Sequence, residues 1–303
     1  MDISAVRIVL VAPAGPLNVG SVARVMKNFG LTQLVLVDPQ CDPLSAEALQ
    51  MAVHAKDVLQ SAWQVKTIPE ALDGCCFAIA TTARQRGFNA PLERPDAVLP
   101  ALALQAQPNS DTALIFGPED RGLSNEELAY AQRFIKIPTD AAYSALNLAQ
   151  AVAVCCYELS RTTQALPREE LTETAAFISK ETQSKTLRAS PLSVTPTKSV
   201  SQMSGTQISV SEGVAVAQLN ELEGYYQHLE HMLLKVEYLY SHTAASRMRK
   251  FRQLLNRANP TSQEVAMLRG ILRQTEWALS NRSSPVPSRP VPSRPEQTDS
   301  SQD

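Results

Sequence analysis

Small polar residues cluster in four short segments, and each segment follows an apolar run that could form a buried strand. Ligands bind at the carboxyl ends of the strands in an open parallel sheet, so four such loops would converge on one crevice. Singly, the loops also have a structural interpretation, because Asn18 and Ser144 can cap helices and Gly117 and Gly122 can form turns. Together they favour a binding site built from residues 18–24, 81–84, 117–124 and 138–149.

The residue types in these loops disfavour several common chemistries. The sequence contains neither G-x-G-x-x-G nor G-x-x-x-x-G-K-S/T, the two common nucleotide fingerprints. It also lacks the G-x-S-x-G motif of hydrolases, and no histidine lies in the four loops, so Ser-His hydrolysis and a catalytic zinc are disfavoured. The arginines, amides and backbone groups that remain suit the transfer of a group from a substrate that already carries the driving force.

The first half of the chain alternates apolar runs with helical patterns, which predicts an α/β fold with a mostly parallel sheet. Residues 5–12 are almost continuously apolar, as a strand buried on both faces should be. Gly30 follows the first expected helix at the position that glycine favours beyond a helix end. The expected strands are residues 5–12, 34–38, 77–81, 113–116 and 134–137, and the expected helices are residues 18–29, 45–63 and 146–161.

Changes in composition divide the 303 residues into four regions. Residues 1–165 form the α/β domain, residues 166–213 a flexible linker rich in Ser and Thr, and residues 281–303 a disordered Pro-rich tail. Residues 214–280 form a small all-α C-terminal module, in which Pro260 begins the last helix with Asn259 as its cap. Apolar residues at steps of three and four predict one buried face of its first helix: Leu219, Leu222, Tyr226, Leu229, Leu233 and Val236.

The C-terminal module carries concentrated positive charge in a chain whose net charge is −2. Residues 244–273 contain seven basic side chains and one acidic side chain, Glu264, which gives this segment a net charge of +6. Contacts to RNA phosphates require such a cluster, although a solvated helix face is the alternative. The predicted RNA-binding residues are Arg247, Arg249, Lys250, Arg252, Arg257, Arg269 and Arg273.

The cysteines and histidines do not form a pattern typical of a metal site. Five cysteines without a C-x-x-C predict reduced thiols. His228 and His231 are three residues apart on an expected helix, but no third ligand is near them, so we predict exposed helix polarity and no metal. No apolar run approaches the roughly 20 residues that span a membrane. The first residues also lack a signal peptide, which predicts a cytoplasmic protein without membrane contact.

The polar loops resemble the three motifs of the SPOUT superfamily of RNA methyltransferases, in particular the TrmH-like group that methylates ribose 2′-hydroxyls. The matching segments are residues 18–24, residues 114–124 with the core Phe116-Gly117-Pro118-Glu119, and residues 137–151 with Leu146-Asn147. Residues 219–272 resemble the extension of the TrmJ branch, which modifies the first nucleotide of the tRNA anticodon loop. The resemblance implies a parallel sheet with a C-terminal trefoil knot and a homodimer whose active site lies at the subunit interface.

The resemblance also implies which residues act. Arg24 corresponds to the family's essential arginine, and Asn18, Glu119 and Asn147 correspond to its companions. Many relatives have Ser directly before the Leu-Asn pair, whereas this chain has Ala145 in that region and its serine at Ser144. S-adenosyl-L-methionine would bind in the knot, largely through backbone groups, at Thr81, Thr82, Ala83, Gly117, Ile137, Ser144, Ala145 and Leu146.

The resemblance therefore predicts an S-adenosylmethionine-dependent tRNA 2′-O-methyltransferase that acts on cytidine or uridine in the anticodon loop. The ribose hydroxyl would attack the methyl carbon in line, and the neutral thioether leaves without help from a metal. Arginine is a poor base, so Arg24 is expected to clamp an RNA phosphate and to orient the hydroxyl. Two alternatives stay open: a ribosomal RNA 2′-O-methyltransferase, and a non-enzymatic RNA-binding protein of the same fold.

Overall fold

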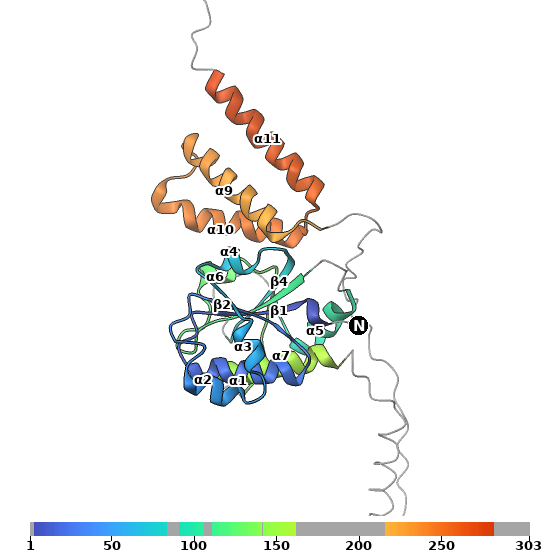
Figure 1. Ribbon diagram of the computed structural model, residues 1–303. Coiled ribbons are helices and arrows are strands. Elements are labelled where there is room, and N and C mark those ends of the chain that lie inside the picture. Colours follow the sequence, from blue (N-terminus) through green and yellow to red (C-terminus); the bar gives the residue numbers. More distant parts are fainter. Residues whose placement is uncertain (1–2, 84–90, 106–110, 141, 162–215, 282–303) are drawn as a thin grey trace, which may run out of the picture.

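The computed structural model describes residues 3–83, 91–105, 111–140, 142–161 and 216–281. Its centre is a seven-stranded sheet in the order β3-β2-β1-β6-β4-β7-β5 (Figure 1). Each neighbouring pair of these strands is parallel. The strands are β1 Val6–Val11, β2 Gln33–Val37, β3 Trp63–Val65, β4 Cys75–Thr81, β5 Leu92–Glu93, β6 Asp111–Phe116 and β7 Arg133–Ile135. The predicted α/β class with a mostly parallel sheet is confirmed.

Both faces of the sheet are covered, because successive strand residues point to opposite sides. Ile8 and Leu10 of β1 belong to one apolar cluster, with α1, α2, α3, α5 and α7, whereas Val9 and Val11 belong to the other, with α4 and α6. The domain's helices are the short 3-10 helix η1 Ile3–Ala5, then α1 Pro16–Asn28, α2 Ala46–Ala52, α3 Lys56–Gln60, α4 Ile68–Ala71, α5 Pro95–Gln105, α6 Asn125–Leu128 and α7 Leu148–Ser160.

The apolar runs predicted β1, β2, β4, β6 and β7 correctly, and the helix predicted over 45–63 is partly wrong. That segment divides into α2 and α3 after Val53, whose φ of +54° is left-handed, and Trp63 begins β3. Neither β3 nor β5 was predicted, because β3 has three residues and its Trp63 is 56% exposed, so no apolar run marks it. Gly30 has the expected left-handed φ of +77°, which closes the end of α1.

The C-terminal part forms three helices: α9 Leu219–Lys235, α10 Ser241–Ala258 and α11 Ser262–Asn281. We call residues 216–281 the helical module. It packs against the same sheet face as α4 and α6, in one apolar cluster that includes Leu222 and Tyr226 of α9 (Figure 1). At its base, Asn220 Nδ2 donates to Asp73 Oδ1 over 2.7 Å, just before β4. The predicted all-α region is confirmed.

Three local expectations in this module are wrong. Asn259 ends α10 in a left-handed conformation, with φ of +46°, and does not cap α11. Helix α11 begins at Ser262 and not at Pro260, and it is capped by Thr261, whose Oγ1 accepts from the Glu264 N–H over 3.2 Å. Val236 is 38% exposed and lies outside the buried face of α9.

The expected linker over 166–213 lies outside the described residues, and so does the expected tail apart from Asn281. The trefoil knot stays a prediction. Across the described ranges, no helix is long and apolar enough to cross a membrane.

Candidate active site

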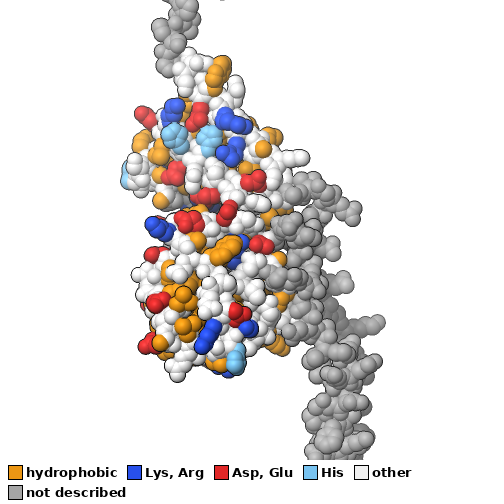
Figure 2. Space-filling model, viewed as in Figure 1, with side chains coloured by type: hydrophobic (Ala, Val, Ile, Leu, Met, Phe, Trp, Pro, Cys, Tyr) orange, Lys and Arg blue, Asp and Glu red, His pale blue; other side chains and the backbone are white. Residues whose placement is uncertain are grey.

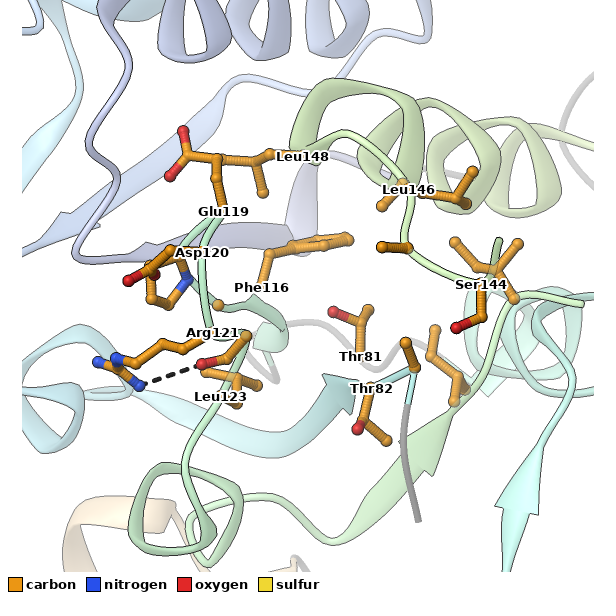
Figure 3. Close-up of a pocket in the computed structure, with 18 residues that line it drawn as sticks. Thr81, Thr82, Phe116, Glu119, Asp120, Arg121, Leu123, Ser144, Leu146 and Leu148 are labelled. Atoms are coloured by element: carbon orange, nitrogen blue, oxygen red, sulfur yellow. Dashed lines mark hydrogen bonds between the residues drawn. The ribbon is translucent and has the colours of Figure 1, made fainter. Parts of the chain in front are cut away.

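A cavity of about 170 Å³ lies at the carboxyl ends of β4, β6 and β7 (Figure 3). Its walls come from the loops that follow these strands and from the start of α7. Three of the four loops predicted to converge therefore meet here, whereas none of residues 18–24 lines the cavity. All eight residues predicted to contact the cofactor line this cavity: Thr81, Thr82, Ala83, Gly117, Ile137, Ser144, Ala145 and Leu146.

The cavity wall combines apolar side chains with hydroxyls and backbone. Figure 3 shows Thr81, Phe116, Ser144 and Leu146 around it. Thr81 Oγ1 donates to the Ile115 carbonyl over 3.2 Å, which ties the end of β4 to β6. Sequence reasoning missed an apolar part of the wall, although its members stand at strand ends or inside the motifs: Phe116, Leu123, Ile135 and Leu148.

Gly117 is required by a close approach of backbone. A Cβ at this position would lie 2.3 Å from the Leu123 nitrogen and 2.4 Å from the Gly122 carbonyl carbon. The loop folds back this tightly because Gly122 adopts a left-handed φ of +66° and donates its N–H to the Pro118 carbonyl over 2.9 Å. Gly117 therefore shapes the cavity wall through its missing side chain.

The far end of the same loop is held by Glu127 of α6. Arg121 donates to both Glu127 oxygens, over 2.8 and 2.9 Å. Burial raises the pKa of Glu127, but hydrogen bonds from Arg121 and from the Ser124 backbone outweigh it and lower the pKa. Arg121 lines the cavity, yet its guanidinium is already paired with Glu127, so the loop is fixed from both ends.

Three of the four predicted catalytic residues form one chain of hydrogen bonds. Asn147 Nδ2 donates to Asn18 Oδ1 over 2.8 Å, and Asn18 Nδ2 donates to Glu119 Oε1 over 2.7 Å. Asn147 caps α7, since its Oδ1 accepts from the Ala149 N–H, and neither Asn18 nor Ser144 is a cap. Helix α1 begins at Pro16 after Gly15, so Asn18 lies inside its first turn. These hydrogen bonds join the start of α1 and the loop after β6 to the start of α7.

Glu119 is an anchor at the N-terminus of α1. Its carboxylate accepts from the backbone N–H of Ala14 over 3.1 Å and of Gly15 over 3.3 Å. Figure 3 shows this carboxylate turned away from the cavity that the residue lines. Partial burial raises the pKa of Glu119, but the bonds from Asn18 and from the Ala14 and Gly15 backbone outweigh it, and the pKa is lowered. The positive end of α1 adds to the stabilisation of the charged form.

Arg24, the fourth predicted catalytic residue, does not lie at the cavity. It is exposed on α1, and the residues that line the cavity do not include it. Among the described residues, its guanidinium forms no hydrogen bond or ion pair. One polypeptide therefore forms both the cavity and the Asn147–Asn18–Glu119 hydrogen bonds, but its own Arg24 lies outside that cavity.

Arg252, one of the predicted RNA-binding residues, is paired inside the protein. Its guanidinium donates to both oxygens of Glu223, over 2.5 and 2.9 Å, and both side chains are 15% exposed. It also lies 4.5 Å from the centroid of Tyr226 and 5.0 Å from that of Tyr130. The Arg252 guanidinium is thus engaged in packing between the helical module and the domain, which argues against the predicted contact with RNA.

The other predicted RNA-binding residues lie on α10 and α11, where Arg249 is half-buried and the rest are exposed. In Figure 2, basic and acidic side chains intermingle on the helical module. These residues are not brought to the cavity. The module contacts Asp73, Ala129 and Ala131, which precede β4 and β7, whereas the cavity lies beyond the opposite ends of those strands. Strand β4 has seven residues, so the two places are about 20 Å apart along it.

His228 is not simply an exposed polar residue of α9. Its Nε2 lies 3.1 Å from Glu276 Oε2 of α11, and its side chain is 18% exposed. The pair connects α9 to α11. In the described part of the chain, no three His, Cys, Asp or Glu residues form a group that could hold a metal.

The cavity and sheet belong to a known class of methylase. Residues 5–157 match the model of the SpoU rRNA Methylase family, and the chain belongs to this family, in its TrmJ group. Residues 220–284 match the model described as tRNA methyltransferase TrmJ, C-terminal domain. The helical module therefore corresponds to the C-terminal domain of this group.

The relatives share the full two-part organisation. The chain is 35% identical over 271 residues to the tRNA (cytidine/uridine/adenosine-2′-O-)-methyltransferase TrmJ of Pseudomonas aeruginosa, covering 89% of this chain and 93% of that one. It is 35% identical over 272 residues to the tRNA (cytidine/uridine-2′-O-)-methyltransferase TrmJ of Escherichia coli, covering 89% and 95%. The crystal structure of TrmJ from Z. mobilis matches with a TM-score of 0.68 and 30% identity, over 89% of this chain and 98% of that one.

Proposed function

We propose that this protein is a tRNA 2′-O-methyltransferase that transfers the methyl group of S-adenosylmethionine to a ribose hydroxyl. The observation that carries the proposal is the convergence of the loops after β4, β6 and β7 on one cavity, with the start of α1 joined to them by the Asn147–Asn18–Glu119 hydrogen bonds. Membership of the TrmJ group supports tRNA as the substrate and cytidine or uridine as the nucleotide. We propose the anticodon loop as its position, as the resemblance of residues 219–272 implies. The proposal places the reaction in the cytoplasm.

The cavity suits a cofactor with a flat apolar ring and a polar chain. Phe116, Ile137 and Leu146 offer apolar surface, and Thr81 and Ser144 offer hydroxyls beside loop backbone. Aromatic ligands in pockets are usually held by this combination, with backbone groups fixing their orientation. When bound, S-adenosylmethionine supplies a methyl group on a positively charged sulfur that leaves as a neutral thioether.

In the proposed mechanism the residues of the motifs position the reacting groups. Glu119 and Asn18 hold the start of α1 against the loop after β6, and Asn147 holds the start of α7 against both. Small displacements of such loops reduce rates strongly, because in-line transfer needs the two reacting atoms at close and fixed separation. Arg24 clamps an RNA phosphate bidentately and orients the ribose hydroxyl, whose proton is lost late, to solvent, as the oxygen takes the methyl group.

We propose further that the enzyme is a homodimer in which Arg24 serves the cavity of the partner subunit. Arg24 lies outside the cavity of its own chain. Apolar side chains are exposed on the two neighbouring helices, with Leu17 of α1 50% exposed and Tyr157 of α7 54% exposed. Contact between two copies through this surface would remove these apolar side chains from water. It would also bring α1 of one copy toward the cavity of the other.

The test is methyl transfer from isotope-labelled S-adenosylmethionine to unmodified tRNA transcripts, with the digested nucleosides read by mass spectrometry. Label on a ribose of the anticodon loop supports the proposal. Label on ribosomal RNA but not on tRNA would favour the ribosomal alternative. Binding of tRNA without any cofactor binding or transfer would favour a non-enzymatic RNA-binding protein.

The shared site is tested by mixing two inactive variants. Arg24→Ala lacks the clamp, and Ala83→Trp fills the cavity. Co-expressed heterodimers contain one subunit with an intact cavity facing an intact Arg24, so activity returns in the mixture. If both variants dimerise and the mixture stays inactive, Arg24 serves its own chain.

A further inference from the structure

The turn between α9 and α10 is rigid and projects aromatic rings. Glu237 adopts a left-handed φ of +60°, and the N–H groups of Tyr238 and Leu239 both donate to the Leu233 carbonyl over 3.0 Å. Leu239 is 2% exposed and fixes the turn to the module beneath it. The residues on either side of it, Tyr238 and Tyr240, are each 55% exposed. In Figure 1 this turn forms the left-hand edge of the helical module.

Each exposed ring is held by a neighbour. Tyr240 stacks on His242 with a centroid distance of 6.0 Å and an interplanar angle of 20°. The Arg247 guanidinium lies 5.5 Å from the centroid of Tyr238 and donates to the Tyr238 carbonyl over 2.9 Å. Rings fixed in this way lose little further freedom when a ligand stacks on them, which favours binding.

The charges around the rings suit an anion. Tyr240 is the N-cap of α10, and the first turn of that helix contains no acidic residue, so its positive end is not neutralised. Lys235 ends α9, and Arg247 follows on the second turn of α10. Glu237 is the one acidic residue within the turn itself. Phosphate groups of a polyanion therefore find the Arg247 guanidinium and a helix N-terminus beside the exposed rings.

We propose that Tyr238, Tyr240, His242 and Arg247 form a stacking site for unpaired RNA bases, with the phosphates contacting Arg247 and the start of α10. Flat aromatic faces next to cations are how proteins bind single-stranded RNA, whereas the faces of paired bases are hidden inside the duplex. This inference rests on the proposed function, because it assigns the unpaired nucleotides of tRNA to a surface of the helical module.

The test compares two labelled RNAs by fluorescence anisotropy: a stem-loop with the anticodon-loop sequence, and a blunt duplex of the same stem. We expect Tyr240→Ala to weaken stem-loop binding about 5- to 150-fold, the usual cost of losing one stacked base, and to leave duplex binding unchanged. Tyr240→Trp should retain binding. Leu254→Ala removes an equally exposed side chain from the same helix, 55% exposed, and should change neither affinity.

Unchanged stem-loop affinity in Tyr238→Ala and Tyr240→Ala would overturn the proposal, and so would an equal loss on both RNAs. A change in mass by light scattering in these variants, with RNA affinity unchanged, would instead assign the rings to contact with a second copy. A methyl-transfer assay of the unmodified protein separates this inference from the proposed function. If the tyrosine variants lose stem-loop affinity but the unmodified protein transfers no methyl group, the proposed activity fails and the stacking site stands.

Discussion

Asn147 and Asn18, 129 residues apart in the chain, are joined by a hydrogen bond of 2.8 Å from Nδ2 to Oδ1. Its direction is fixed, because the Oδ1 of Asn147 already accepts from the Ala149 N–H at the start of α7. The Oδ1 of Asn18 is therefore used as an acceptor, and its Nδ2 must donate, which it does to Glu119. Each amide has one orientation that satisfies both partners, so the three motif loops have one mutual arrangement.

Asn18→Asp tests this arrangement. The change replaces a donor by a second carboxylate next to Glu119, 2.7 Å from its Oε1 in the present structure. Two adjacent carboxylates share one proton, so the pKa of Glu119 should rise and methyl transfer at neutral pH should fall at least about tenfold. Lowering the pH should restore part of the rate as one carboxyl becomes protonated. Asn28→Asp makes the same charge change at the exposed end of α1 and should have little effect.

In the unmodified protein, the stability that Glu119 contributes decreases when the pH is lowered, whereas the rate of Asn18→Asp should increase. The pKa of Glu119 is lower in the folded protein than its ordinary value of 4.5. Its contribution to folding is therefore complete above that value and is lost as the pH falls through the lower folded pKa. A fall in activity between pH 7 and 5 that disappears in Glu119→Gln would contradict this account.

Five of the seven strands of the described sheet could be predicted from sequence, but β3, β5 and the Asn147–Asn18–Glu119 hydrogen bonds could not. Continuous apolar runs mark strands that are buried on both faces, as in β1 and β6. The hydrogen-bond chain joins residues more than 100 positions apart, and no local pattern specifies which amide group donates. Asn18 was interpreted as a cap because its residue type suits one, whereas Pro16 at the first helical position moves the start of α1 earlier.

The basic residues of the helical module illustrate the same limit. Composition makes Arg252 equivalent to Arg257, and both follow a helical pattern. Packing separates them, because Arg252 faces Glu223, 29 residues away, while Arg257 is exposed. The eight residues predicted to contact the cofactor line one cavity because they belong to loops at strand ends, where a parallel sheet brings loops together.

Gly117→Ala should reduce methyl transfer roughly 100-fold by displacing the loop. The added Cβ would lie 2.3 Å from the Leu123 nitrogen, so backbone must move, and a shift of about 1 Å can cost roughly 100-fold in rate. Isothermal titration with S-adenosylmethionine should show weaker binding as well. Gly270→Ala is the matched control, since nothing lies within 4 Å of its added Cβ, and it should stabilise α11 by about 0.5–1 kcal/mol. Normal transfer by Gly117→Ala would contradict the close approach.

Arg252→Ala should destabilise the protein rather than selectively weaken RNA binding. Removal of one partner leaves Glu223 charged, 15% exposed and unpaired in the structure, which typically costs about 3–5 kcal/mol. Arg257→Ala removes an exposed charge and should change stability by no more than about 0.5 kcal/mol. Urea denaturation of the full chain measures both. Equal stability of the two variants would show that the pair with Glu223 does not hold the module.

The exposed cations of α10 and α11 should determine how RNA affinity depends on salt. Each phosphate contact releases a counterion, so the logarithm of the affinity should fall linearly with the logarithm of salt concentration. Arg273→Ala, an exposed position of α11, should reduce that slope by about one and weaken binding to all RNA sequences alike. Arg94→Ala removes an exposed arginine of the α/β domain that is paired with Asp96, 2.9 Å away, and should leave the slope unchanged. Fluorescence anisotropy over a salt series measures the slopes. An unchanged salt slope in Arg273→Ala would show that Arg273 does not contact a phosphate. If Arg94→Ala instead reduced the slope by about one, the RNA would lie across the α/β domain and not across the helical module.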